Sequence, residues 1–159
     1  MRLIDDPAAV HRRREQMHAP WATAADAAPW TASLDGEWAF HLAARPEEAP
    51  SGCEQPGFDD RGWARIPVPG NWELHGHGEA IYQNVAYPFV PEDYPAAPQD
   101  NPTGCYRTAF DIPAAWAGRR VFIEFGSVDA AFHLWVNGSE AGFSTDSKLP
   151  AHFEITALV

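Results

Sequence analysis

The chain has 159 residues, with 22 acidic and 11 basic side chains and a formal net charge of −11 at pH 7. Its length fits one domain that can bury a core of its own. The acidic balance argues against nucleic acids and anionic membranes as partners, because both attract basic surfaces. The net charge says little about neutral ligands such as sugars.

The first twenty residues show neither a signal peptide nor a membrane span. Arg12, Arg13 and Arg14 form a basic cluster, but no apolar stretch follows it, and no run in the chain approaches membrane-spanning length. We therefore expect a cytoplasmic protein. Cys53 and Cys105 are expected to be free thiols, with a disulfide as the alternative.

Residues 1–32 are rich in alanine, proline and charge, and we expect them to form an N-terminal arm. Residues 8–17 contain good helix formers after Pro7, which predicts a short helix. Residues 19–29 predict an extended segment. The nearby Trp21 and Trp30 favour contact with another surface over a loose tail.

The rest of the chain shows the alternation and turn signals of β-strands. Residues 37–43 place Trp38, Phe40 and Leu42 on one face. Asn137-Gly138 predicts a tight hairpin, since both residues tolerate a positive φ. The further expected strands are residues 63–68, 106–112, 120–125, 131–136, 139–144 and a last one around 153–157. With no convincing helices between the strands, this spacing indicates an all-β, antiparallel β-sandwich.

A long loop system interrupts the strands between residues 71 and 106. Its prolines break ladder pairing, and its aromatic side chains argue against disorder. A loop of this length in a compact domain is usually functional. We therefore expect binding residues in it.

Several separated motifs in one order resemble the N-terminal sugar-binding domain of family 2 glycoside hydrolases, in particular bacterial β-galactosidases. The motifs are residues 34–38 (LDGEW), 69–72 (PGNW), 81–89 (IYQNVAYPF), 101–106 (NPTGCY), 131–138 (AFHLWVNG) and 146–150 (DSKLP). The resemblance implies a jelly roll of the galactose-binding-domain type over residues 33–159. It also implies that the chain stops before the last strands, leaving an open edge that invites pairing with a second copy.

Two residues carry the expected ligand contacts. On residue type alone, Asn84 is a loop asparagine, and Asp146 is either a turn residue or an oxygen ligand for hydroxyls or a hard cation. The resemblance implies that Asn84 binds galactose. It also implies that Asp146 binds both the substrate and a sodium ion, with Lys148 standing where the family often has arginine.

Two further groups of residues each allow a functional and a plainer interpretation. Glu73, His75 and His77 could share one strand face, but the neighbouring glycines and the lack of a recognised ligand spacing favour no metal there. Four aromatic residues of the loop system could stack on a sugar or pack in a core, and both interpretations stay open: Trp72, Tyr82, Tyr87 and Phe89.

The resemblance implies a retaining β-galactosidase as the parent enzyme, with both catalytic glutamates on a downstream (β/α)₈ barrel that this chain lacks. The chain alone is then expected to be inactive and to hold no catalytic residue. Its expected partners are a β-galactoside, the barrel and other domains of the parent, and a second copy. Sodium would need ligands from the full enzyme, and magnesium would bind outside this chain. The alternatives are a stand-alone carbohydrate-binding or assembly module, or the same domain of a β-glucuronidase or β-mannosidase.

Overall fold

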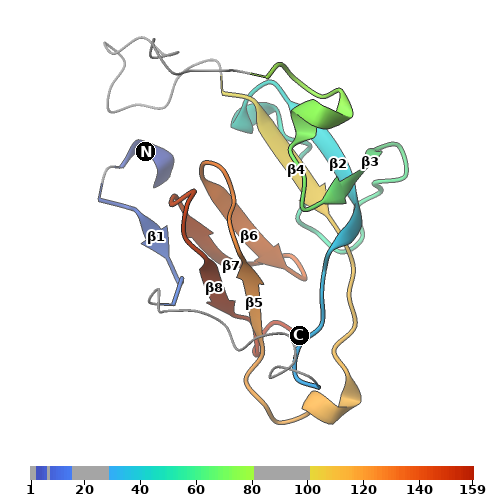
Figure 1. Ribbon diagram of the computed structural model, residues 1–159, viewed down its shortest axis with the longest axis vertical. Coiled ribbons are helices and arrows are strands. Elements are labelled where there is room, and N and C mark those ends of the chain that lie inside the picture. Colours follow the sequence, from blue (N-terminus) through green and yellow to red (C-terminus); the bar gives the residue numbers. More distant parts are fainter. Residues whose placement is uncertain (1–2, 7, 16–28, 81–100) are drawn as a thin grey trace. The chain divides into compact units, whose positions relative to one another are not determined.

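The computed structural model describes residues 3–6, 8–15, 29–80 and 101–159 (Figure 1). Over these residues the chain is all-β, with short 3₁₀ turns and every strand pairing antiparallel, as predicted. No helix in the described ranges is long and apolar enough to cross a membrane. The strands are β1 (His11–Arg12), β2 (Gly36–Ala43), β3 (Ala64–Val68), β4 (Thr103–Arg107), β5 (Phe122–Phe125), β6 (Phe132–Val136), β7 (Ser139–Ser144) and β8 (Ala151–Glu154). The 3₁₀ helices are η1 (Leu3–Asp5), η2 (Pro46–Glu48), η3 (Trp72–His75) and η5 (Ala114–Trp116).

The strands fall into two compact units. The sandwich unit comprises Met1–Ser33, Glu54–Pro56 and Asp111–Val159, and the three-strand unit comprises Leu34–Cys53 and Gly57–Phe110. The sandwich unit holds a sheet of order β1-β7-β6 and a second sheet of β5 and β8. The three-strand unit holds one sheet of order β3-β2-β4.

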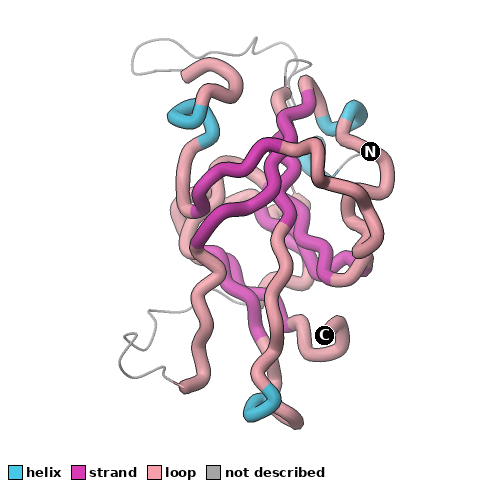
Figure 2. Tube along the Cα trace, turned by 90° about the vertical axis from the view of Figure 1, so that its right-hand side faces the viewer, coloured by secondary structure: helices cyan, strands magenta, loops and turns pink. Residues whose placement is uncertain are grey.

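Aromatic rings from both sheets meet inside the sandwich unit. Phe132 on β6 lies 4.9 Å from Phe125 on β5 and 5.9 Å from Phe153 on β8, measured between ring centroids. Phe153 is fully buried, as is Ile155 beyond the end of its strand. This core comes from apolar side chains that alternate along the paired strands, and its rings join the two sheets. The described part of the chain consists of strands and loops with short helical turns (Figure 2).

The three-strand unit is centred on β2. Its residues Gly36–Phe40 pair with β3, and Ala39–Ala43 pair with β4. Phe40 is buried and is surrounded by the rings of His77, Tyr106 and Trp72, with centroids 4.8, 4.9 and 5.8 Å away. Residue 104 is a glycine because a Cβ there would lie only 2.4 Å from the Trp72 ring.

The predicted hairpin is confirmed. Asn137 and Gly138 have φ angles of 50° and 79°, which suits a tight turn between β6 and β7. The ladder between β6 and β7 is irregular, with a register shift between Leu134 and Trp135. The strand pattern therefore predicts this hairpin and its turn correctly.

The predicted helix over residues 8–17 is wrong for the described residues 8–15. His11 and Arg12 instead pair with Ser144 and Phe143 of β7, and Arg13 Nη1 donates to the Glu140 carbonyl at 2.7 Å. A ten-residue helix is marginal in water, so edge pairing and these polar contacts override the local propensity. The segment 19–28 of the predicted arm lies outside the described residues.

Two strand boundaries also differ from the prediction. The strand expected over 106–112 is β4, which begins at Thr103 and ends where Arg107 faces Ala39 of β2. The last strand, expected around 153–157, is β8, and it ends at Glu154. Pairing with the neighbouring strand sets where each strand begins and ends, and an alternating sequence pattern alone does not reveal this pairing.

Candidate functional site

Asn84, the expected galactose ligand, falls in residues 81–100, outside the described residues. Tyr82, Tyr87 and Phe89 fall there too. Their expected roles stay predictions.

Asp146 lies in the turn that follows β7. Its Oδ1 accepts a hydrogen bond from the Lys148 backbone N–H at 3.1 Å, which is the turn geometry that a short acidic side chain favours. The structural role expected from the residue type is therefore confirmed. The side chain is half-buried. Because this bond uses only one carboxylate oxygen, the second oxygen can still accept a hydrogen bond.

The N-terminal arm fixes the position of this turn. The Val10 carbonyl accepts hydrogen bonds from both Thr145 N–H at 3.2 Å and Thr145 Oγ1 at 2.8 Å. Arg14 Nη1 donates to Ser144 Oγ at 2.7 Å. The arm therefore holds the two residues directly before Asp146.

A shallow cavity of about 560 Å³ surrounds Asp146. It is lined by Val10, Arg14, Asp129, Thr145, Asp146, Ser147 and Lys148. Two carboxylates offer acceptors, and the guanidinium, the ammonium and two hydroxyls offer donors. This mixture suits a neutral ligand with several hydroxyl groups better than a strongly charged one.

Arg14 is one of several residues of this pocket that the sequence did not single out as site residues. Its Nε is buried and has no hydrogen-bond partner among the residues that the structure describes. The three consecutive arginines carried no spacing signal that distinguished it from Arg12 and Arg13. Only the pairing of β1 with β7 brings it to Asp146.

The pocket does not fit a sodium ion by itself. One Asp146 oxygen is engaged in the turn, and a hard cation takes about six oxygen ligands. Across the described ranges, no group of three or more His, Cys, Asp or Glu side chains is placed to hold a metal. A sodium ion at Asp146 would need further ligands.

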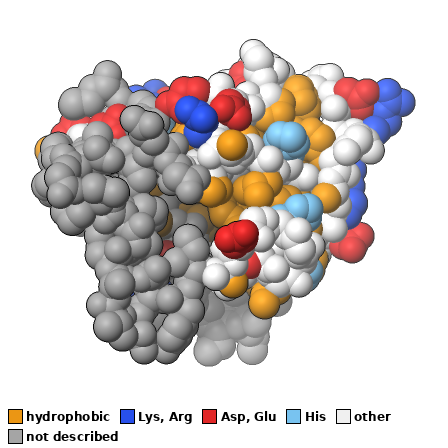
Figure 3. Space-filling view, turned by 90° about the horizontal axis from the view of Figure 1, so that it is seen from above, with side chains coloured by type: hydrophobic (Ala, Val, Ile, Leu, Met, Phe, Trp, Pro, Cys, Tyr) orange, Lys and Arg blue, Asp and Glu red, His pale blue; other side chains and the backbone are white. Residues whose placement is uncertain are grey.

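Trp72 packs in the three-strand unit. Its ring lies over Gly104 and beside Phe40, which confirms the packing interpretation for this residue. The neighbouring Leu74 is 80% exposed. Histidine side chains lie among hydrophobic ones on the face seen in Figure 3.

Comparison with known proteins defines the class. Residues 31–159 match the family model for the sugar-binding domain of family 2 glycosyl hydrolases. The chain therefore belongs to this family of glycoside hydrolase domains, as its motifs indicated.

The curated relatives are named β-galactosidases. The chain is 43% identical to that of Psychromonas ingrahamii over 155 residues, covering 92% of this chain and 15% of the relative. It is 48% identical to that of Vibrio cholerae over 124 residues, covering 78% of this chain and 12% of the relative. The chain thus spans only a small part of the length of these relatives.

Solved structures show the same fold. The chain matches a β-glucuronidase of Bifidobacterium dentium with a TM-score of 0.58 and 20% identity, covering 79% of this chain and 17% of that one. A β-glucuronidase of Ruminococcus gnavus gives 0.55 and 22%, covering 80% and 18%. At this identity the likeness supports the fold alone, and the predicted jelly-roll sandwich is confirmed.

Proposed function

We propose that this chain is the N-terminal sugar-binding part of a β-galactosidase that hydrolyses terminal β-D-galactosides such as lactose. The observation that carries the proposal is the 43–48% identity to curated β-galactosidases over most of the chain. The Asn84 loop motif and the strand start at residues 101–106 support it.

The neighbouring members of the family are the second candidate. Solved β-glucuronidases share the fold, but at 20–22% identity they carry no argument about substrate. A stand-alone carbohydrate-binding or assembly module is a third. Tight sugar binding by the chain alone would distinguish that module from a domain that works only with a barrel.

In the proposed mechanism, the parent enzyme retains configuration at the sugar carbon. Such hydrolysis uses two carboxyl groups about 5–5.5 Å apart, one as nucleophile and one as acid and base. The barrel would supply both. This chain would position the substrate: Asn84 and Asp146 would hold the galactose hydroxyls so that the reacting carbon is well placed. Such positioning lowers the entropic part of the activation barrier.

The proposed metals belong to the complete enzyme. Sodium at Asp146 requires ligands that the described pocket does not supply, and magnesium is proposed to bind outside this chain. The barrel, the other domains and a second copy are the proposed protein partners.

The test is a galactoside assay on the purified chain, alone and mixed with the separately expressed remainder of its enzyme. We expect no turnover alone and turnover on mixing. Turnover by the chain alone would contradict the proposal. Glucuronide turnover without galactoside turnover on mixing would favour the second candidate.

Variants then test the two contacts. Asn84→Ala should lower kcat/KM of the mixture about tenfold or more, as expected for a lost positioning contact, while the neighbouring Gln83→Ala serves as its control. Asp146→Asn keeps an oxygen for the Lys148 turn and removes the charge. Lower activity in Asp146→Asn therefore reports a ligand role. Unchanged activity with a deficit only in Asp146→Ala would reduce Asp146 to a turn residue.

A further inference from the structure

The sequence contains two cysteines, and the fold brings them together in the three-strand unit. Cys53 lies in the turn after η2, where its N–H donates to the Pro50 carbonyl at 3.1 Å. Cys105 is the central residue of β4 and faces His41 across the ladder with β2. Fifty-two positions of sequence separate them, so their meeting is a property of the fold.

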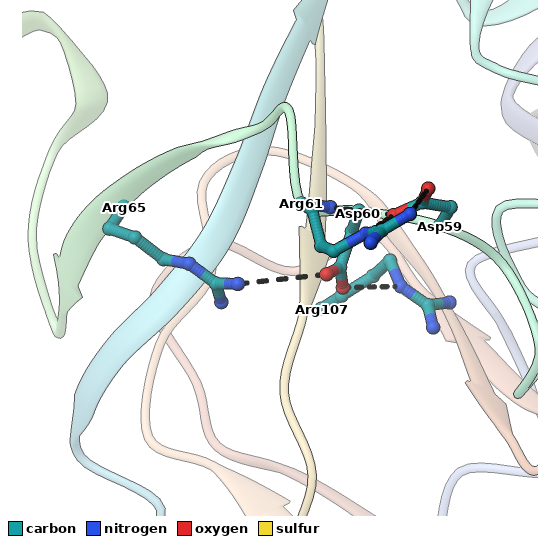
Figure 4. Close-up of polar contacts among 5 residues, drawn as sticks. All are labelled: Asp59, Asp60, Arg61, Arg65 and Arg107. Atoms are coloured by element: carbon teal, nitrogen blue, oxygen red, sulfur yellow. Dashed lines mark hydrogen bonds and ion pairs between the residues drawn. The ribbon is translucent and has the colours of Figure 1, made fainter.

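Arg107 holds the Cys53 turn against β4. Side chains two positions apart on a strand share a face, so Cys105 and Arg107 point the same way. The Arg107 guanidinium donates Nη1–H to the Cys53 carbonyl and Nε–H to Asp60 Oδ2, the second at 3.0 Å. Asp60 Oδ1 also lies 3.6 Å from Arg65 (Figure 4). This charge-assisted network fixes the Cys53 backbone on the face that carries Cys105.

The two side chains lie close together. Arg107 binds the Cys53 carbonyl from the strand face that Cys105 shares, so the two half-buried thiols are close enough for each to influence the other. Burial, and then the neighbouring Cys53, raises the pKa of the Cys105 thiol to about 11. Because thiolate is the reacting form, this raised pKa makes Cys105 a poor nucleophile near neutral pH.

We propose that Cys53 and Cys105 form a redox-modification site that closes to an intramolecular disulfide with a low-molecular-weight disulfide, such as oxidised glutathione. The Cys53 thiolate attacks one sulfur of the oxidant, a Cys53–glutathione bond forms, and one glutathione thiolate leaves. Cys105 then loses its proton and attacks the Cys53 sulfur, which releases the second glutathione thiolate. The two protein thiols lose two protons and two electrons, and the oxidant disulfide is reduced to two thiols.

The bond would enclose the segment that contains Asn84, since Asn84 lies between Cys53 and Cys105 in the sequence. A cross-link over so long a loop restricts the unfolded chain strongly. The oxidised protein should therefore melt at a higher temperature. This inference concerns a modification of the chain and does not depend on the proposed sugar contacts.

The experiment uses the purified, fully reduced chain incubated with oxidised glutathione, blocked with iodoacetamide and weighed without reduction. We expect a monomer that is lighter by two hydrogens and carries no alkyl group. A tryptic digest should link residues 15–61, which stay joined because Arg45 precedes proline, to residues 66–107. The closing step should accelerate from pH 7 to pH 9 as the Cys105 thiol loses its proton more readily.

Thermal unfolding gives a second readout. Oxidation should raise the melting midpoint by on the order of 10 °C, and dithiothreitol should reverse the rise. In Cys53→Ser and Cys105→Ser the same treatment should leave the midpoint unchanged. Two alkylated thiols after oxidation, a lasting glutathione adduct, disulfide-linked dimers, or a lower midpoint in the cross-linked protein would each overturn the proposal.

Discussion

The two units of the chain build their cores in different ways. In the sandwich unit, Phe125, Phe132 and Phe153 come from two sheets, with ring centroids 4.9–6.4 Å apart. In the three-strand unit, one sheet supplies Phe40 and Tyr106, and η3 with the residues after it supplies Trp72 and His77. The first core is closed by strand pairing on both sides, and the second is closed by a short 3₁₀ turn.

The two cores differ in how easily they can close a cavity. Phe153 is fully buried between paired strands, whereas Tyr106 in the other core is 37% exposed. A ring held by a single short turn can shift into a vacated space more easily than a ring packed between two sheets. Mutations of matched chemistry in the two units should therefore differ in cost.

The largest effect should come from removing the central ring of each core. Phe153→Ala should lower the free energy of unfolding by about 4 kcal/mol, because the surrounding strands cannot close the cavity. Phe40→Ala should cost about 3 kcal/mol, since Trp72 can move toward the space. Urea unfolding measures both, with the 42%-exposed Phe122→Ala as a control of small effect. A larger loss of stability in Phe40→Ala than in Phe153→Ala would show that the core of the three-strand unit does not yield more easily.

Each core also rests on a strand glycine. A Cβ at Gly142 would lie 2.4 Å from the Phe153 ring and 2.7 Å from the Arg12 carbonyl, while one at Gly104 would meet the Trp72 ring at 2.4 Å. Gly142→Ala should cost about 3 kcal/mol and Gly104→Ala about 1–2 kcal/mol, because backbone yields less than a partly exposed ring. Thermal melts of the two variants test this. Gly62→Ala, where a Cβ meets nothing within 4 Å, is the control.

The three-strand unit also contains a half-buried ionic network. Arg107 is 19% exposed and bonds both Asp60 and the Cys53 carbonyl, so Arg107→Ala should cost about 2 kcal/mol because both groups lose the guanidinium as a donor. Arg61 pairs with Asp59 at 2.6 Å, but its side chain is 87% exposed. Arg61→Ala should leave the unfolding midpoint unchanged, as exposed ion pairs usually do. Equal losses in the two variants would show that burial does not set the strength of these pairs.

The sequence predicted the parts of this fold that depend on local pattern. Alternation and Asn137-Gly138 are local signals, so β2, the β6–β7 hairpin and the all-β class followed from them. The family motifs led to the sugar-binding domain. Asp146 lies in a turn after β7, which is the plainer of the two roles that its residue type allowed, and its ligand role stays a prediction.

What the sequence could not predict depends on distant pairing. β1 has two exposed residues and no apolar periodicity, so nothing local distinguished it from a helix. Arg14 enters the pocket only through that pairing, and the proximity of Cys53 to Cys105 follows from the Arg107 network. These features join residues far apart in the chain.

The smallest effect concerns a buried charge in the sandwich unit. Glu124 on β5 faces His152 on β8, with Oε2 2.6 Å from Nε2, and its side chain is only 10% exposed. Burial raises the pKa of Glu124 to about 7. The folded state therefore binds a proton that the unfolded state releases near pH 4.5. This contribution to stability is present in full below pH 4.5 and is lost as the pH rises through 7.

Glu124→Gln removes this titration and keeps the shape of the side chain. We expect the variant to match the wild type near pH 4.5 and to exceed it by about 1 kcal/mol at pH 8. The difference between the two urea curves, followed from pH 4.5 to 8, isolates Glu124 because the other groups titrate in both proteins. Glu154→Gln, at an exposed position where Arg120 lowers the carboxyl pKa, should not reproduce the trend. A wild type that is more stable than Glu124→Gln at pH 8 would show that the His152 contact, rather than burial, controls this carboxyl group.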